Sequence, residues 1–207
     1  MGSEMCIRDR IKGVSGAIAP LRGESVGVVR IAQFTQSTAD EVAAELKALR
    51  AQGAQAFAFD LRRNAGGFLG GGIDTARLLL PRGATITTVV DKTGAELKYD
   101  AVEDGPEAAT PLYVVVDEKT ASASEVLTAA LRDNGRATVV GGPRTFGKGI
   151  IQTIEPIREG RAGGVAVTVA RYRTPAGNYI NKVGVTADRP TDCPSSLEAV
   201  KCIEKTL

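Results

Sequence analysis

Short runs of apolar and β-branched residues, each bounded by turn-forming residues, recur along the first two thirds of the chain. Runs of this kind are typical of strands that are buried on both faces. We therefore predict strands at residues 26–32, 56–61, 85–90, 112–117 and 137–141.

The segments between these strands carry apolar residues at helical spacing. One helix is predicted to begin at Ser37 or Thr38, which are both suitable N-caps, and to stop before Gly53. A second helix follows the glycine-rich stretch 66–72, and a third covers residues 122–134. Strands that alternate with helices in this way indicate an α/β domain.

The pattern changes after residue 148, where apolar and polar residues begin to alternate. Segments 150–157 and 164–174 are rich in β-branched residues and flank a glycine-rich turn at 160–164, which is typical of a hairpin. Residues 195–207 have the pattern of a short capped helix. The expected fold class is therefore α/β, with a mixed sheet and C-terminal β-hairpins.

The N-terminal residues do not share these patterns. Residues 1–10, MGSEMCIRDR, show neither helical nor strand periodicity, and we interpret them as a non-native leader. Residues 11–25 are expected to be the remnant of an N-terminal region. The core is expected at 26–190 and a tail helix at 191–207.

The composition removes several classes of function. The chain has 207 residues and no histidine, which excludes Ser-His-Asp and Cys-His catalysis and nearly every catalytic zinc site. We expect no metal and no other cofactor. A net charge of +2 and only 4% aromatic residues argue against a nucleic-acid partner. No apolar run has the length of a transmembrane helix, so we expect no integral membrane segment.

The segment TASASE, residues 120–125, places a serine at a strand-to-helix junction. Ser122 and Glu125 fit the S-x-x-E pattern of a capping box. A serine in this position can instead be an exposed nucleophile beside backbone N–H donors. Ser124 is a second candidate for that role.

Two glycine-containing segments could complete such a site. Gly66 and Gly67 in DLRRNAGG follow a strand and could offer N–H groups to an oxyanion, although a tight turn would need the same residues. Lys148 in GGPRTFGKG lies between two glycines, and Gly142, Gly147 and Lys148 have the spacing of a phosphate-binding loop. Gly149 replaces the Ser or Thr of that loop and a strand follows instead of a helix, which disfavours nucleotide binding. A structural turn with an exposed lysine remains an alternative to catalysis.

Together the three segments contain the parts of a Ser-Lys hydrolase. A lysine is a poor base when it is charged, but desolvation favours the neutral amine, which can take a serine proton.

Two cysteines lie close together near the C-terminus. Cys193 and Cys202 could be incidental buried thiols or could form a small disulfide loop in an oxidising compartment.

These motifs resemble those of the carboxyl-terminal processing peptidases, also called tail-specific proteases. The resemblance rests on DLRRNAGG, KTASASEVLTAALRDNGRA, TFGKGIIQ and VTVARYRTPAGNYI followed by GVTAD, and it runs from about Val26 to Asp188. It implies a ClpP/crotonase-like serine protease core. We expect residues 11–25 not to include the PDZ domain that this family normally carries.

The resemblance also implies residue roles. Ser122 would be the nucleophile, Lys148 the general base and Gln152 the residue that orients the lysine. The N–H groups of Gly67 and Ala123 would form the oxyanion hole. The remaining matches to the motifs, expected to be structural or supporting, are Gly66, Glu125 and Asp133.

The best match within the family is to the algal and plant enzymes that trim the photosystem II reaction-centre precursor. This implies protein substrates with unstructured C-terminal tails and an extracytoplasmic location, with the thylakoid lumen favoured and the bacterial periplasm as the alternative. The competing hypothesis is a catalytically incompetent peptide-binding or scaffolding fragment. A third, an acyl-CoA-type binder, lacks a basic patch for the phosphates.

Overall fold

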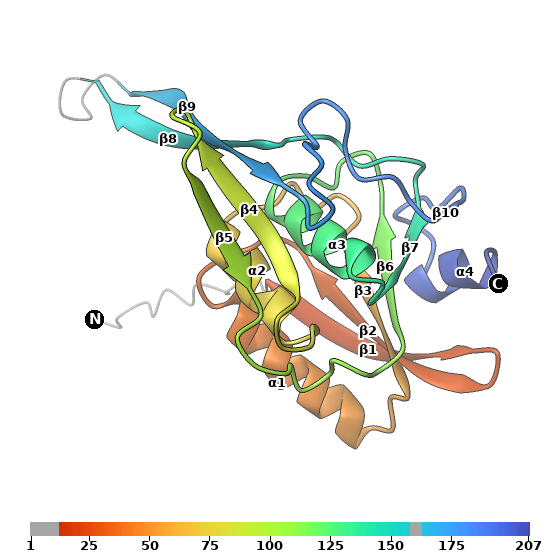
Figure 1. Ribbon diagram of the computed structural model, residues 1–207. Helices are drawn as coiled ribbons and strands as arrows, with labels where there is room; N and C mark the ends of the chain where they lie inside the picture. Colours follow the sequence, from red (N-terminus) through yellow and green to blue (C-terminus); the bar gives the residue numbers. More distant parts are fainter. Residues whose placement is uncertain (1–12, 158–162) are drawn as a thin grey trace, which may run out of the picture.

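The computed structural model describes residues 13–157 and 163–207 as a layered α/β domain (Figure 1). A six-stranded mixed sheet forms the centre, and a four-stranded antiparallel sheet extends from it as a long arm. The predicted fold class is confirmed.

The six-stranded sheet has the order β1-β2-β3-β6-β7-β10. Only β1 and β2 are antiparallel, whereas all the other neighbours run parallel. The strands are β1 (Val14–Leu21), β2 (Glu24–Ile31), β3 (Ala56–Asp60), β6 (Leu112–Val116), β7 (Thr138–Gly141) and β10 (Arg189–Pro190).

The second sheet has the order β5-β4-β9-β8 and consists of two hairpins joined through β4 and β9. Its strands are β4 (Thr85–Asp91), β5 (Glu96–Asp100), β8 (Ile150–Pro156) and β9 (Gly164–Arg173). The hairpin predicted after Lys148 is therefore present. Most of the turn expected at 160–164 lies outside the described residues.

Helices cover both faces of the central sheet. Alternate residues of the strands point to opposite faces, so that Phe57 and Phe59 pack under α1 (Thr38–Ala51), α2 (Leu69–Arg77) and α3 (Ala123–Asp133). Ala56 and Ala58 face the other side, where α4 (Ala199–Glu204) packs. The three helices predicted before residue 135 and the short tail helix are all confirmed, although no side chain caps the tail helix.

Three strands escaped the sequence pattern: the two-residue β10 and the longer β1 and β5. β1 lies within residues 11–25, which were set apart from the core, and it pairs along its whole length with β2. β5 lies in the polar segment between residues 91 and 112 and pairs with β4. Both are edge strands, and β1 buries only its end residues Val14 and Leu21, so neither carries a strand-like alternation.

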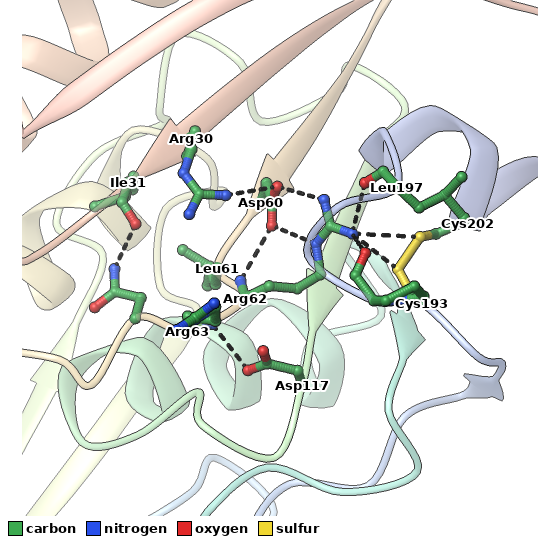
Figure 2. A network of polar contacts seen from close by, with 12 residues as sticks. Arg30, Ile31, Asp60, Leu61, Arg62, Arg63, Asp117, Cys193, Leu197 and Cys202 are labelled. Carbon is green, nitrogen blue, oxygen red and sulfur yellow. Dashed lines mark hydrogen bonds and ion pairs between the residues drawn. A yellow bond between two sulfur atoms is a disulfide. The ribbon is translucent and has the colours of Figure 1, made fainter.

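A disulfide joins Cys193 to Cys202 and closes a short loop within the C-terminal segment. Figure 2 shows the buried guanidinium of Arg62 between this bridge and Asp60. Its Nη1 donates to the carbonyls of Pro194 (2.7 Å) and Leu197 (2.8 Å). The bridged alternative for the two cysteines is therefore the one observed.

No helix in the described part of the chain has both the length and the apolarity needed to cross a membrane.

Candidate active site

The three segments singled out in the sequence leave the same edge of the central sheet. β3, β6 and β7 are adjacent and parallel, so their carboxyl ends lie side by side. The loop after β3 carries Gly66 and Gly67, the loop after β6 leads to Ser122, and the loop after β7 carries Lys148. Ligand sites in parallel α/β sheets lie at this edge.

Ser122 is the N-cap of α3 and has a left-handed backbone with φ 57° and ψ −120°. Non-glycine residues rarely adopt this conformation, and they do so most often at functional sites. Gly66 lies directly against it, since a Cβ at Gly66 would come within 2.6 Å of the Ser122 Cβ. The sharp turn leaves the Ser122 side chain partly exposed.

Ser124 is in a different position. It is fully buried, and its hydroxyl donates to the Asn64 carbonyl at 3.1 Å. A substrate carbonyl has no access to it. Of the two serine candidates, only Ser122 faces the edge of the site.

The two N–H groups expected to form an oxyanion hole lie near this serine. A Cβ on Gly66, the neighbour of Gly67, would meet the Ala123 nitrogen at 2.9 Å. In the described residues, neither the Gly67 N–H nor the Ala123 N–H donates to a protein acceptor. Gly66 N, in contrast, is bonded to Asn64 Oδ1 at 2.8 Å.

Lys148 lies in a loop that only glycines could form. A Cβ at Gly147 would meet backbone atoms of residues 180–184 at about 2.9 Å, and one at Gly149 would meet the Asn181 nitrogen at 2.4 Å. The lysine side chain is exposed. Within the described chain, no hydrogen bond joins its amine to the Ser122 hydroxyl.

The loop does not bind phosphate in the manner of a nucleotide-binding loop. β8 follows it instead of a helix, and the N–H groups of Gly147 and Lys148 already have a protein acceptor. That acceptor is the Glu125 carboxylate.

Glu125 is fully buried at the third position of α3 and binds four donors. Its Oε1 accepts from Thr145 Oγ1 (2.5 Å) and from the N–H of Gly147 (2.7 Å). Its Oε2 accepts from the N–H of Ser122 (2.9 Å) and from the N–H of Lys148 (2.8 Å). The carboxylate half of the predicted capping box is thus present, and the same side chain also binds the lysine loop.

Tyr172 of β9 lies where the segments of Ser122 and Lys148 meet at Glu125, although the sequence patterns did not single it out. Its buried hydroxyl donates to the Lys148 carbonyl. Burial and the nearby Glu125 raise the pKa of Tyr172 well above its usual value, while a contact with the Ser122 side chain lowers it. The phenol is therefore protonated at neutral pH and acts only as a hydrogen-bonding group.

Two predicted residues are not brought to the serine. The Gln152 side chain is exposed on β8 and bonds to Thr168 Oγ1 at 3.5 Å. Asp133 is at the far end of α3, where its carboxylate accepts from the Ala176 N–H at 3.1 Å. It holds the loop after β9, away from the site.

Comparisons with known proteins show which family the chain is similar to. A family model described as "Peptidase family S41" matches residues 25–191. A carboxyl-terminal-processing protease of Synechocystis sp. is 47% identical over 174 residues, covering 83% of this chain and 39% of that protein. A chloroplastic C-terminal processing peptidase of Tetradesmus obliquus is 43% identical over 180 residues, covering 86% of this chain and 38% of that protein.

A solved structure titled "photosystem II D1 C-terminal processing protease" matches with a TM-score of 0.80 and 38% identity. The match covers 95% of this chain and 52% of that one. The chain spans about two fifths of the length of the curated relatives and about half of the solved structure.

Proposed function

The chain belongs to peptidase family S41, and from this membership and the geometry of its sheet edge we propose that it is the catalytic core of a serine endopeptidase. Ser122 is the nucleophile and Lys148 the general base. The substrates are proteins with unstructured C-terminal tails. The observation that carries the proposal is a single Glu125 oxygen, Oε2, which accepts hydrogen bonds from the backbone N–H groups of both Ser122 and Lys148.

The proposed reaction has two steps, and the lysine carries one proton in each. The neutral Lys148 amine takes the proton of the Ser122 hydroxyl while Oγ bonds to the scissile carbonyl carbon. The lysine then gives this proton to the leaving amine as the C–N bond breaks, which leaves an acyl-enzyme. A water attacks the ester, and one of its protons passes through Lys148 to Ser122 Oγ as the ester C–O bond breaks. The new C-terminus leaves as a carboxylic acid, which loses its proton to solvent.

The N–H groups of Gly67 and Ala123 support the proposed steps, because both are free of protein acceptors in the described chain. They can bind the oxyanion that develops as Ser122 attacks, and one such donor is worth about 10²- to 10³-fold in kcat. In the proposed reaction, the bound substrate shields Lys148 from water. A peptide lying over Ser122 would exclude water from the exposed amine, which favours its neutral form.

Gln152 has the proposed role of orienting the lysine. Its present partner, Thr168, is 3.5 Å away, at the limit of a hydrogen bond, so the amide can be released at little cost. We expect Gln152→Ala to reduce kcat less than any change of Lys148.

The names of the relatives support a more specific substrate and location. Cyanobacterial and chloroplastic processing enzymes are among the relatives, and the matching solved structure is named for the D1 protein of photosystem II. We propose maturation of a photosystem II reaction-centre precursor in the thylakoid lumen, with the bacterial periplasm as the alternative. The Cys193–Cys202 bridge favours an oxidising compartment of either kind.

Labelling with a fluorophosphonate probe tests the reaction directly. The chain should react with one equivalent of probe, Ser122→Ala should not react, and Ser124→Ala should still be labelled. A peptide with the sequence of the D1 precursor tail should then be cleaved at one site. The exposed Lys148 favours a second candidate, an incompetent peptide-binding fragment, which would bind the tail peptide without being labelled.

A further inference from the structure

Glu125 has more contacts than a helix cap requires. A capping box needs its carboxylate to bind one N–H at the N-cap, which is the bond to Ser122. Three of its four bonds go instead to the loop after β7, at Thr145, Gly147 and Lys148. Most of its hydrogen-bonding capacity is therefore used to join two segments that are 20 or more residues apart in sequence.

The division of these bonds between the two oxygens is informative. Oε1 binds only the lysine loop, whereas Oε2 binds the N–H of Ser122 and the N–H of Lys148 together. Both distances to Oε2 are below 3 Å, so the two backbone nitrogens cannot separate without breaking a bond to a buried charge. Loss of such a bond inside a protein costs more than in water.

The charge on Glu125 is held by dipoles. No salt bridge reaches this carboxylate in the described residues. Its place in the first turn of α3 lets the helix N-terminus stabilise a negative charge, and the donated N–H groups complete its solvation. A neutral side chain of the same shape could not accept all four bonds.

Tyr172 holds the next peptide group, on the other side of the Lys148 Cα. Glu125 binds the N–H of Lys148, and the Tyr172 hydroxyl binds its carbonyl. The tyrosine also contacts the Ser122 side chain. Two buried side chains from different elements, α3 and β9, therefore grip the backbone on both sides of the proposed base.

From these contacts we propose that Glu125, assisted by Tyr172, is a positioning residue that sets the distance between the nucleophile and the base. The inference rests on the proposed Ser-Lys reaction and deepens it. Neither residue binds the substrate in this role. Their loss should lower the rate of the chemical step and leave substrate affinity nearly unchanged.

Glu125→Gln is the decisive variant, because it keeps the shape and replaces one acceptor oxygen with an NH₂ group that must face N–H donors. The fluorophosphonate labelling rate and kcat should each fall about 100-fold, the cost of misplacing a catalytic group by about 1 Å. KM for a tail peptide should stay within about twofold. Tyr172→Phe, which removes one hydroxyl, should lower both rates about 5- to 10-fold, since one hydrogen bond is worth about 1 kcal/mol.

Asp188→Asn is the matched control. Its carboxylate also accepts a backbone N–H, from Val139 at 2.9 Å, and a second donor, Arg132. Asp188 contacts the N-terminal end of β7 and the C-terminal end of α3, whereas Ser122 is at the N-terminal end of α3. This variant should be less stable in urea and should be labelled within twofold of the wild-type rate.

The outcomes separate the inference from the proposed function. A wild-type chain that neither labels nor cleaves would remove the Ser-Lys reaction itself. A folded Glu125→Gln chain that labels at the wild-type rate would overturn the positioning role and leave that reaction standing. If Glu125→Gln does not fold, Tyr172→Phe decides, because unchanged labelling of that variant contradicts the grip on Lys148. A rise in KM with an unchanged kcat would show substrate binding instead of positioning.

Discussion

Asp60 and Glu125 are both buried carboxylates at the edge of the sheet that carries the candidate site, yet their partners differ. Asp60 is paired with cations: Arg62 donates to it from Nε (2.9 Å) and Nη2 (2.7 Å), and Arg30 donates at 3.1 Å. Glu125 is bound by three N–H groups and a hydroxyl. One carboxylate is paired with guanidinium groups, and the other is bound by uncharged donors.

The difference separates stability from reactivity. Arg62 connects Asp60 to the C-terminal segment and its disulfide, so this network ties the last residues to β3 (Figure 2). Glu125 connects the two loops that carry Ser122 and Lys148. We therefore expect substitutions around Asp60 to change mainly the free energy of unfolding, and substitutions around Glu125 to change mainly the rate of the reaction.

The largest expected effect is that of Lys148→Arg. Arginine keeps the positive charge of Lys148, but a guanidinium does not deprotonate in proteins and cannot accept the Ser122 proton. We expect cleavage of a tail peptide to fall by at least about 10³-fold, as for the loss of a member of a catalytic unit. Circular dichroism should show an unchanged fold. Cleavage at the wild-type rate would mean that lysine is not the base.

Arg62→Met should have the largest effect on stability. The substitution leaves Asp60 buried with Arg30 and the backbone N–H of residue 62, and it removes the bonds to the tail carbonyls. Removing one partner of a buried ion pair costs about 3–5 kcal/mol, which urea denaturation can measure. At low urea, folded molecules should be labelled near the wild-type rate. A severe loss of labelling without a loss of stability would reverse the roles of the two networks.

Loss of the disulfide should have a smaller effect on the same network. The bridge joins two residues that are nine positions apart and so restricts the unfolded chain. The Cys193→Ser, Cys202→Ser double variant should therefore lose about 2–3 kcal/mol of the free energy of unfolding. Thiol titration of the denatured wild type provides the check: one of the three cysteines should react before reduction and all three after it. Three reactive thiols from the start would contradict the bridge.

Ser124→Ala is expected to have the smallest effect. It removes a buried hydrogen bond to the Asn64 carbonyl, worth about 1 kcal/mol, and leaves Ser122 in place. Labelling should be retained, whereas Ser122→Ala abolishes it. Loss of labelling in Ser124→Ala with normal labelling of Ser122→Ala would mean that Ser124, and not Ser122, is the nucleophile.

The sequence predicted the elements with strong internal patterns and missed those whose stability comes from a neighbour. Strands such as β3, in which every residue is buried, have an unmistakable apolar run. β5 is polar and exposed along most of its length and is a strand only because β4 supplies its hydrogen-bonding partner. Pairing of this kind depends on residues distant in the chain, which local periodicity does not record.

The candidate site shows the same division. Ser122 and Lys148 could be found from motifs, because glycines and a strand-to-helix junction mark their loops. The S-x-x-E pattern revealed Glu125 only as a cap, since its bonds to Gly147 and Lys148 form across the sheet edge. Tyr172 carried no signal, because an aromatic residue on a strand is most often a core residue. Gln152 and the oxyanion donors stay predictions.

The left-handed backbone of Ser122 has a consequence for how sequences of this kind can change. A residue held in such a conformation costs of the order of 1–3 kcal/mol, and glycine alone adopts it without strain. Selection for stability alone would therefore favour a glycine at position 122. We expect a serine at this position to be kept only where its hydroxyl is used, so inactive descendants of this fold should lose it early.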